Sequence, residues 1–483
     1  MSGDFRAGFA DLLSEIEVPD LAVSGEVPAW LAGSFLRNGP ALFTVGGQRY
    51  NHWFDGLAML HRFGFEGGQV SYRNRFLASE NYVRVRATDK RQYDQFATNP
   101  PRNLLQKIVD TVDFRLQFGN NQLVNIGRLG GSWLALGETV TQLEIDPDTL
   151  TMRGPVKWRN RMLSMITSAH PVRDDIRRAV FNCDSLVLPF ASRYKLWRLD
   201  DGSRNRRVIA SLPVARPAYM HSFGASENYL ILTEMPMRVN PWAMLFGAFT
   251  GVPFIENFHW SGEDVKFTVI AKDSGKVTGT FHAPAFFAFH HVNAVEDGEG
   301  AISLDIVTYP DTAIIQRTYF KALFGADGGA LPASHLVRYQ LPIRGEGALM
   351  PPQQLAAPAF EMPVVHPQLQ GRPYRFVYGY GFDNPGNFND TLFKIDLSAL
   401  AGDTIGKWHA PDCYPSEPVF VPRPGGTEED DGVILSVVFD ANSDCSFLLV
   451  IDAASFTEIA RAAVPHAIPH GLHGTFAEKG EQE

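Results

Sequence analysis

The sequence predicts an all-β protein whose strands close into one propeller. Most of the chain consists of short stretches of alternating apolar and polar residues, separated by Gly, Pro, Asn and Asp. Helical patterns are few, and no linker rich in Pro or Ser divides the 483 residues. Seven four-stranded blades fit this length, because one blade needs about 40–60 residues. The chain has no clear sequence repeat, so the strand pattern alone leaves the number of blades open.

The predicted strands alternate in the manner of antiparallel sheets that bury one face. We expect one propeller domain over residues 1–483, with loops and helices over one face. The N-terminal extension, residues 1–30, begins with a short amphipathic pattern that predicts a helix ending at Pro19. A second helix is predicted over residues 313–323. The strand patterns occupy residues 72–77, 133–146, 194–200, 228–234, 266–272, 301–309, 335–341, 374–381, 391–397, 432–440 and 446–464.

Composition excludes several classes of protein. The formal charge is −10, and no basic stripe is available to displace counterions, so a nucleic-acid partner is not expected. Three cysteines cannot form a disulfide framework, which favours a reducing, cytoplasmic setting. The N-terminus lacks the basic and apolar regions of a signal peptide. No protein partner is implied.

Two apolar segments, residues 102–116 and 239–255, are candidates for contact with a membrane. Both are too short to span a bilayer. The second contains Pro and Gly, as a loop would, but it also concentrates aromatic and aliphatic side chains. It is either an insertion packed on the core or a patch that enters one leaflet from the inner face of the membrane. The docking candidates are Trp242, Leu245, Phe246 and Phe249.

Four of the fourteen histidines occur in apolar or small-residue settings near predicted strand ends. Side chains from different blades converge on the axis of a propeller, so residues far apart in sequence can bind one metal ion. A hydrogen-bonded core histidine is the alternative for each of them, since no short ligand motif such as HExxH is present. The four are His170 in TSAHP, His221 in YMHSF, His290 in FAFHHVNA and His473 in HGLHGTF.

Three glutamates lie in unusually apolar surroundings: Glu138 in LALGET, Glu361 in AFEMPVV and Glu417 in YPSEPVFVP. A metal-bound imidazole commonly donates its second N–H to a carboxylate, which orients the ring. Four neutral histidines with three such carboxylates suit a first-row divalent metal. Alternatively, each glutamate accepts backbone N–H groups or pairs with an arginine such as Arg375.

Longer motifs resemble the carotenoid cleavage oxygenase family, and most closely its β-carotene oxygenase and retinal pigment epithelium branch. The resemblance runs from about Gly33 to Phe476 in the family's order. It is carried by GSFLRNGPALF and YNHWFDGLAMLHRFGFEGGQVSYRNRFL within residues 33–77, by the four histidine motifs, and by SEPVFVPRPGGTEEDDGVILSVVFD at 416–440.

The resemblance implies a seven-bladed propeller that holds Fe(II) on its axis. The family's four histidine ligands match His170, His221, His290 and His473, so His291 and His470 are not ligands. The family's supporting glutamates match Glu138, Glu361 and Glu417, and chain order pairs them with His221, His290 and His473. Membership also favours the membrane-docking role for both apolar segments.

Two positions bear on the substrate. Relatives that cleave stilbenes or isoeugenol carry a lysine just before the first glutamate, and this chain has Gly137 there. Many bacterial and plant relatives have a threonine fourteen residues before that glutamate. The residue here is Val124, as in the animal branch.

The expected activity is that of a nonheme iron dioxygenase, with O2 as co-substrate, that cleaves a conjugated double bond of an apolar polyene. Central 15,15′ cleavage of β-carotene to retinal is the leading candidate, and an apocarotenoid or stilbenoid is the alternative substrate. An isomerohydrolase of retinyl esters and a noncatalytic propeller that binds apolar ligands are further alternatives. The residues expected to line the substrate tunnel are Phe54, Tyr82, Val124, Trp260 and Phe287.

Overall fold

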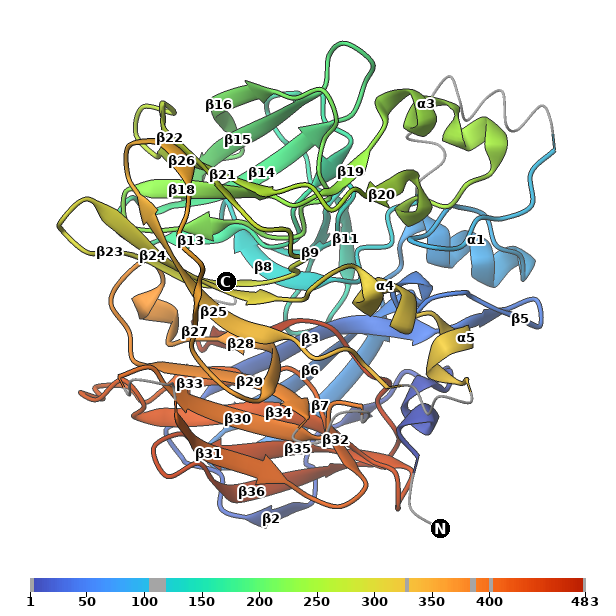
Figure 1. The fold of residues 1–483 in the computed structure, drawn as a ribbon. Coiled ribbons are helices and arrows are strands. Elements are labelled where there is room, and N and C mark those ends of the chain that lie inside the picture. Colours follow the sequence, from blue (N-terminus) through green and yellow to red (C-terminus); the bar gives the residue numbers. More distant parts are fainter. Residues whose placement is uncertain (1–3, 104–118, 326–329, 383–387, 399–402, 481–483) are drawn as a thin grey trace.

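The computed structural model describes residues 4–103, 119–325, 330–382, 388–398 and 403–480. Within these residues, the strands pair into seven sheets arranged as the blades of a propeller (Figure 1). Two short two-stranded ribbons lie outside the blades. The seven-bladed architecture predicted from the sequence is confirmed.

Each blade is antiparallel, apart from β26, which pairs in parallel with β22. The first blade contains β1 (Glu17–Val18), β3 (Gly33–Leu42), β6 (Leu57–Glu66), β7 (Gln69–Phe76) and β37 (Gly474–Glu478). The second contains β8 (Asn125–Leu129), β9 (Ser132–Leu136), β10 (Leu143–Ile145) and β11 (Met152–Pro155). The third contains β12 (Ile166–Thr167), β13 (Val172–Asp174), β14 (Ala179–Leu186), β15 (Arg193–Asp200) and β16 (Arg207–Pro213).

The fourth and fifth blades lie beside each other and supply two of the candidate metal ligands. The fourth contains β17 (Gly224–Ala225), β18 (Tyr229–Glu234), β21 (Val265–Ala271), β22 (Val277–Ala283) and β26 (Gly345–Ala348). The fifth contains β23 (His291–Glu296), β24 (Ala301–Thr308), β25 (His335–Pro342) and β27 (Gln353–Gln354).

The last two blades complete the ring. The sixth contains β28 (Ala359–Val364), β29 (Phe376–Phe382), β30 (Thr391–Asp396) and β31 (Asp403–His409). The seventh contains β2 (Val23–Gly25), β32 (Cys413–Pro415), β33 (Val419–Pro422), β34 (Gly432–Asp440), β35 (Cys445–Asp452) and β36 (Thr457–Val464).

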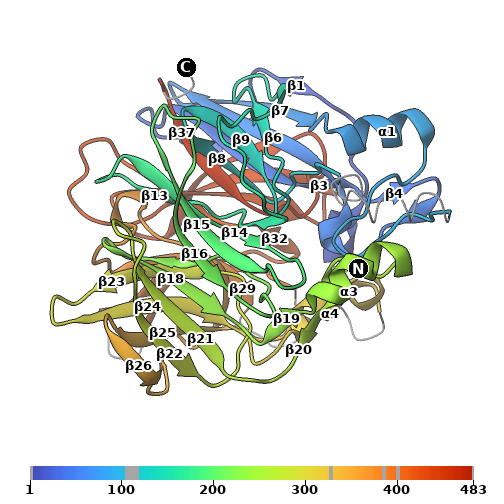
Figure 2. The same cartoon turned by 90° about the horizontal axis from the view of Figure 1, so that it is seen from above.

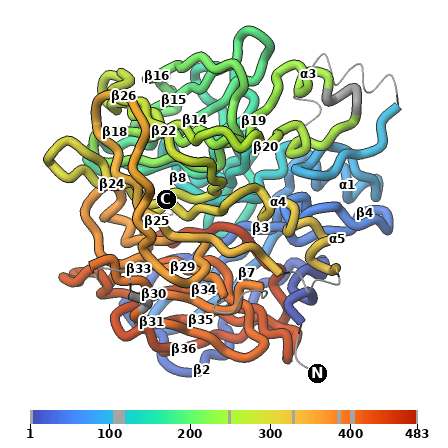
Figure 3. The backbone as a smooth tube through the Cα atoms, viewed as in Figure 1, coloured from blue at the N-terminus to red at the C-terminus, as the bar shows by residue number. Residues whose placement is uncertain are grey.

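The two ends of the chain close the propeller together. C-terminal β37 pairs with β3, with Gly33 opposite Glu478 and Arg37 opposite Gly474. Figure 3 shows N-terminal β2 beside β36. N-terminal β1 and β2 add to the first and seventh blades. The predicted N-terminal helix is therefore wrong for most of its length. Only Phe5–Phe9 is helical, as a 3-10 turn, because backbone groups after it bond to other parts of the chain: the Leu12 N–H donates to the Ala41 carbonyl, and Glu17–Val18 pairs with β7.

Helices and loops gather on one side of the propeller, as expected. Figures 1 and 2 both place α1, α3 and α4 together there. These outer elements are α1 (Glu80–Thr88), α3 (Pro241–Thr250), α4 (Ala313–Arg317), α5 (Phe320–Leu323), the ribbons β4 (Thr44–Val45) with β5 (Gln48–Arg49) and β19 (Met237–Val239) with β20 (Phe258–Trp260), and the 3-10 helices η1 (Phe5–Phe9), η2 (Trp53–Asp55) and η4 (Ile255–Asn257). A further 3-10 helix, η5 (Pro367–Leu369), precedes β29.

Three predicted elements differ in the structure. The helix over 313–323 divides into α4 and α5 at Thr318, whose hydroxyl donates to the Ile314 and Ile315 carbonyls. The strand over 133–146 divides into β9 and β10, and Glu138 lies in the connection. Residues 239–255, with their loop-like Pro and Gly, include the helix α3. Most of the 102–116 segment lies outside the described residues.

Candidate metal centre and its cavity

The four candidate histidines meet at one point, although they come from four blades. His170, His221, His290 and His473 each lie shortly before an edge strand of a blade, namely β13, β17, β23 and β37. Their ligand nitrogens all lie within 4.8 Å of one another. The propeller thus brings together residues that lie as far apart in the sequence as His170 and His473.

Serine hydroxyls connect the backbones that carry these histidines. The Ser168 hydroxyl donates to the His221 carbonyl at 2.6 Å, and the Ser222 hydroxyl donates to the Phe289 carbonyl at 2.6 Å. On the other side, the His473 N–H donates to the Val124 carbonyl. Neighbouring blades are therefore linked at the ligands themselves, which holds the rings in place before any ion binds.

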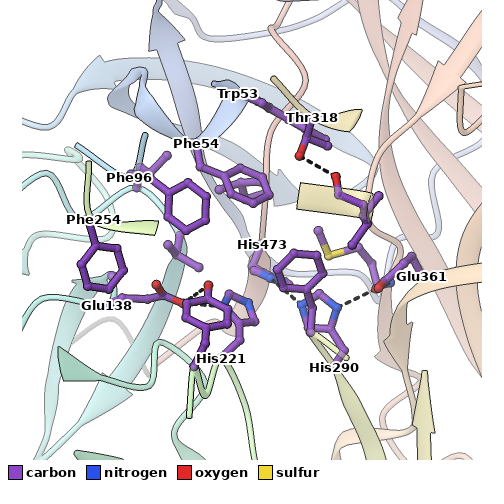
Figure 4. A pocket seen from close by; sticks show the side chains of 18 of the residues that line it. Trp53, Phe54, Phe96, Glu138, His221, Phe254, His290, Thr318, Glu361 and His473 are labelled. Carbon is purple, nitrogen blue, oxygen red and sulfur yellow. Dashed lines mark hydrogen bonds and ion pairs between the residues drawn. The ribbon is translucent and has the colours of Figure 1, made fainter. Parts of the chain in front are cut away.

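The ring geometry matches that of a metal site. The Nε2 atoms of His170 and His221 lie 2.9 Å apart. Those of His290 and His473, which Figure 4 shows side by side, lie 3.2 Å apart. Adjacent imidazoles bound at roughly 2.1 Å, at right angles around one ion, would place their nitrogens about 3 Å apart. The four rings are thus spaced as ligands of a single ion would be.

Each of the three glutamates accepts a hydrogen bond from one histidine. His221 Nδ1 lies 2.7 Å from Glu138, His290 Nδ1 lies 2.6 Å from Glu361, and His473 Nδ1 lies 2.6 Å from Glu417. The pairing follows the chain order expected from the motifs. Because Nδ1 carries the proton, the Nε2 lone pair of each ring faces the centre. A divalent cation would satisfy these converging lone pairs, so the donor set fits a metal.

The lowered pKa values of His170 and His473 keep both imidazoles neutral, which is the state that can bind a cation. Burial lowers the pKa of His170 well below its ordinary value, and His473, His221 and His290 lower it further. Burial also lowers the pKa of His473, although Glu417 opposes that effect. A neutral imidazole is the form that binds metal.

Glu361 and Glu417 remain ionised despite their burial. Burial by itself would raise the pKa of both Glu361 and Glu417. For Glu361 the charge and hydrogen bond of His290 and the Met362 N–H outweigh burial, so its pKa is lowered. For Glu417, the interactions with His473, Arg37 and the Gly474 N–H outweigh burial, so its pKa is also lowered. Two carboxylates therefore offset part of the charge that an ion would bring.

Local backbone geometry directs Glu361 toward His290. Strand β28 contains an irregularity between Glu361 and Val364, and Met362 has a φ of 48°, which is rare for a residue with a side chain. The Met362 N–H donates to the Glu361 carboxylate at 2.8 Å. A bulge of this kind changes the direction of a side chain at the end of a strand.

Residues that sequence reasoning did not identify support the same glutamates. The Tyr219 hydroxyl donates to Glu138 at 2.7 Å, and Arg37 donates to Glu417 at 2.9 Å. Arg37 stands in the motif GSFLRNGPALF, but nothing in that motif indicates a partner in another blade. Arg37 is buried against Glu417 only in the folded protein, where β3 lies near the residues that precede β33.

A large cavity opens directly over the histidines. The empty space between its walls measures about 1510 Å³, a volume that includes open solvent at the mouth of the cavity. Figure 4 shows Phe54, Phe96 and Phe254 around the space beside His221 and His290. The lining is mainly apolar, and it includes Trp53, Phe54, Phe96, Leu123, Val124, Ile166, Tyr219, Met244, Phe254, Phe289, Leu331 and Leu472.

Two of the five predicted tunnel residues, Phe54 and Val124, line this cavity. The other three do not. Tyr82 lies on α1 and stacks on Phe76 at 4.5 Å in a separate cluster. Trp260 lies on β20, facing another small pocket. Phe287 is fully buried behind Phe289, 4.8 Å between ring centres, so Phe289 reaches the cavity in its place.

Gly137 also lies in the cavity wall. A Cβ atom at this position would lie 2.7 Å from Gln122 Oε1 and 3.3 Å from Gln122 Cα. A lysine here would therefore require Gln122 to move. This argues against the phenolate-binding arrangement of the stilbene-cleaving relatives.

The predicted membrane segment forms part of an exposed apolar surface. Trp242 and Phe246 of α3 are 47% and 53% exposed, and Leu245 is partly exposed. Phe190, from another blade, is 98% exposed and packs against Trp242 with ring centres 5.5 Å apart. We call Phe190, Trp242, Leu245 and Phe246 the α3 patch. The side chain of Phe249 lies outside the described part of α3.

The profile of a family described as "Retinal pigment epithelial membrane protein" matches residues 9–478, nearly the whole chain. The chain belongs to the carotenoid cleavage oxygenase family. This confirms the family predicted from the motifs. It is an enzyme family, since the relatives are named as dioxygenases.

Among these relatives, the mitochondrial carotenoid-cleaving dioxygenase of Macaca fascicularis is 31% identical, covering 97% of this chain and 94% of the relative. The chloroplastic carotenoid cleavage dioxygenase 8 homolog B of Oryza sativa subsp. japonica is 35% identical, covering 94% and 81%. The solved structure of a cobalt-substituted Synechocystis apocarotenoid oxygenase superposes with a TM-score of 0.85 at 27% identity, covering 99% and 98%.

No helix within the described residues has the length and apolar character needed to cross a bilayer.

Proposed function

We propose that this enzyme is a nonheme Fe(II) dioxygenase that uses O2 to cleave a conjugated C=C bond of a carotenoid. The observation that carries the proposal is the position of four converging histidines beneath a large apolar cavity. β-Carotene cut at its 15,15′ bond is the first candidate. One alkene and one O2 give two carbonyl groups, so β-carotene yields two molecules of retinal.

In this proposal, His170, His221, His290 and His473 bind the iron, and the neutral rings leave its charge intact. Iron, when bound, supplies the activation of O2. Glu138, Glu361 and Glu417 orient three of the rings through Nδ1 and raise their basicity. The protein supplies no other acid or base that the reaction requires.

Besides the residues that bind and support the iron, the proposal gives a role to the residues of the cavity wall. Phe54, Phe96 and Phe289 present apolar surface beside the histidines and exclude water from a hydrocarbon chain. An apolar tunnel also determines how far a polyene can slide past the iron. The bond that is cut therefore depends on the length of cavity on either side of the four rings.

An apocarotenoid is the second candidate substrate. The observation that favours it is a polar pair, Tyr380 and Asn389, within the mainly apolar lining. One solved relative is named an apocarotenoid oxygenase. A phenolic stilbenoid is supported less well because Gly137 provides no cation. A noncatalytic propeller that binds apolar ligands would have no need of the histidine–glutamate pairs.

The test is a product profile. Iron-loaded enzyme is incubated with β-carotene, an apocarotenal and resveratrol, and the products are separated by chromatography. Retinal from β-carotene supports the first candidate, and cleavage of the apocarotenal alone supports the second. Cleavage of resveratrol alone contradicts both. Protein that purifies without stoichiometric iron and cleaves none of the three would be a binding protein instead.

We also propose that the enzyme is cytoplasmic and docks on the inner face of the membrane through the α3 patch. Three exposed aromatic side chains on adjacent elements are suited to the interfacial region of a bilayer. Met244 of the same helix lines the cavity, so a polyene could pass from the lipid to the iron beside α3.

A further inference from the structure

The cavity wall contains two polar side chains whose hydrogen-bonding capacity is largely unused by the other described residues. Tyr380, on β29, and Asn389, which precedes β30, line the cavity and are 6% and 7% exposed. Among the described residues, the one polar contact of these two side chains is with each other. A phenol and a carboxamide offer more donors and acceptors than this single contact occupies. The remainder faces the cavity.

The other polar side chains of the lining are held by the protein. Thr318 donates to backbone carbonyls, and Ser334 both donates to and accepts from the backbone of Phe360. Tyr219 donates to Glu138, and Asn121 contacts Gly56 and Ala58. These groups shape the wall, whereas the Tyr380–Asn389 pair is free to bind a ligand.

The position of the pair is well defined. Tyr380 lies directly opposite Glu361 in the β28–β29 ladder, so its side chain stands on the same face as the carboxylate that supports His290. The Asp390 N–H donates to the Gly381 carbonyl, and Phe388 packs against Phe5. Asn389 is therefore held beside Tyr380 and close to the metal centre.

We propose that Tyr380 and Asn389 bind an oxygen atom carried by the substrate. This rests on the proposed function and decides between its two candidate substrates in favour of the second: a polyene with a carbonyl or hydroxyl group, such as an apocarotenal, rather than the hydrocarbon β-carotene. The Tyr380 hydroxyl and the Asn389 amide N–H both donate, which suits a carbonyl. The Asn389 carbonyl can also accept from a hydroxyl.

The preference follows from desolvation. A hydrocarbon that fills the cavity removes water from both side chains and returns no hydrogen bond, which is unfavourable for a buried polar group. The oxygen of an aldehyde accepts hydrogen bonds from these side chains in place of the lost water. Sites built to bind a substrate oxygen discriminate strongly against analogues that lack it. We expect the aldehyde to bind roughly 10-fold more tightly than the hydrocarbon.

The experiment measures binding without turnover. Iron-loaded enzyme without O2 is titrated with a polyene aldehyde and with the polyene of equal length that ends in a methyl group. Quenching of protein fluorescence reports binding, because Trp53 lines the cavity. Wild-type enzyme should show the roughly 10-fold ratio of dissociation constants, and Tyr380→Phe with Asn389→Leu should reduce it below about 3-fold by weakening only the aldehyde.

Tyr378→Phe is the matched control. It removes a hydroxyl from the same strand that has no hydrogen-bond partner among the described residues and lies outside the cavity, so the ratio should stay at the wild-type value. Should the double variant not fold, Tyr380→Phe alone carries the test, with an expected loss of at least about 3-fold in the ratio. Equal affinities in the wild type, or a ratio that both variants leave unchanged, overturn the proposal. Failure to cleave any polyene in O2 instead overturns the proposed function.

Discussion

Arg37 and Glu417 form a buried ion pair directly behind His473. The guanidinium lies 2.9 Å from the carboxylate, and the side chains are only 4% and 8% exposed. Glu417 also accepts from His473 Nδ1 and from the Gly474 N–H, while Arg37 donates to the Leu472 carbonyl. One arginine thus joins the supporting carboxylate to the backbone on both sides of a candidate ligand.

Arg37→Ala should destabilise the fold and weaken metal binding. Removal of one partner leaves Glu417 buried without its cation, which costs about 3–5 kcal/mol in the free energy of unfolding. Chemical denaturation measures this loss, and iron content after dialysis measures the second effect. Arg338→Ala is the control, since it breaks the Asp305 pair in the fifth blade and should leave iron content unchanged. Equal iron retention by both variants would count against a role for Arg37 at the centre.

His290→Ala should lose both iron and activity. The ring has Nε2 at the centre and Nδ1 on Glu361, so the variant removes one donor and leaves a buried carboxylate without its partner. Metal analysis of the purified protein measures the first effect. The neighbouring His291 is the control, because its ring pairs with Ser222 and Thr233 instead. His291→Asn should therefore keep its iron, and full activity in His290→Ala would disprove the ligand assignment.

The strand pattern was sufficient to predict a closed all-β fold, since most strands alternate clearly, as in β7 with its regularly spaced buried residues. The seven blades were implied by the family resemblance. The histidines and glutamates could be located because whole motifs resemble a family. Arg37 could not, because its partner Glu417 is 380 residues away and no local pattern connects them.

The direction of the side chains near the propeller axis is the second feature that could not be predicted from the sequence. Phe287 and Phe289 have similar sequence surroundings, yet only Phe289 reaches the cavity, because the backbone before β23 is irregular rather than a strand. Trp260 and Tyr82 are likewise aromatic residues whose direction depends on ribbons and helices outside the blades. Composition identifies such residues as apolar but cannot show which cluster they join.

Asp55 should make stability depend on pH. It is fully buried, it accepts from the His52 and Ala97 N–H groups and from Thr98, and it holds the loops that carry Phe54 and Phe96. Burial raises the pKa of Asp55 to about 6, although these hydrogen bonds act in the opposite direction. The folded protein therefore binds this proton more tightly than the unfolded chain does, where the pKa is about 3.9.

The contribution of Asp55 is thus fully present below about pH 4 and is lost as the pH rises through 6. The loss amounts to about 3 kcal/mol in the free energy of unfolding. Denaturation of the wild type and of Asp55→Asn across this range measures it, because the variant does not titrate at this position. A stability difference between the two proteins that stays constant from pH 4 to pH 7 would contradict the raised pKa.

Replacement of Trp242, Leu245 and Phe246 by serine should move the enzyme from the membrane pellet to the supernatant. These residues supply most of the α3 patch, and the net charge of −10 disfavours electrostatic attraction to anionic lipid. Docking should accordingly change little with salt. Ile176→Ser with Met350→Ser is the control, since both residues are exposed and apolar but lie outside the patch. Iron content should be the same in all three proteins, and an unchanged distribution of the triple variant would favour packing of α3 on the core without lipid contact.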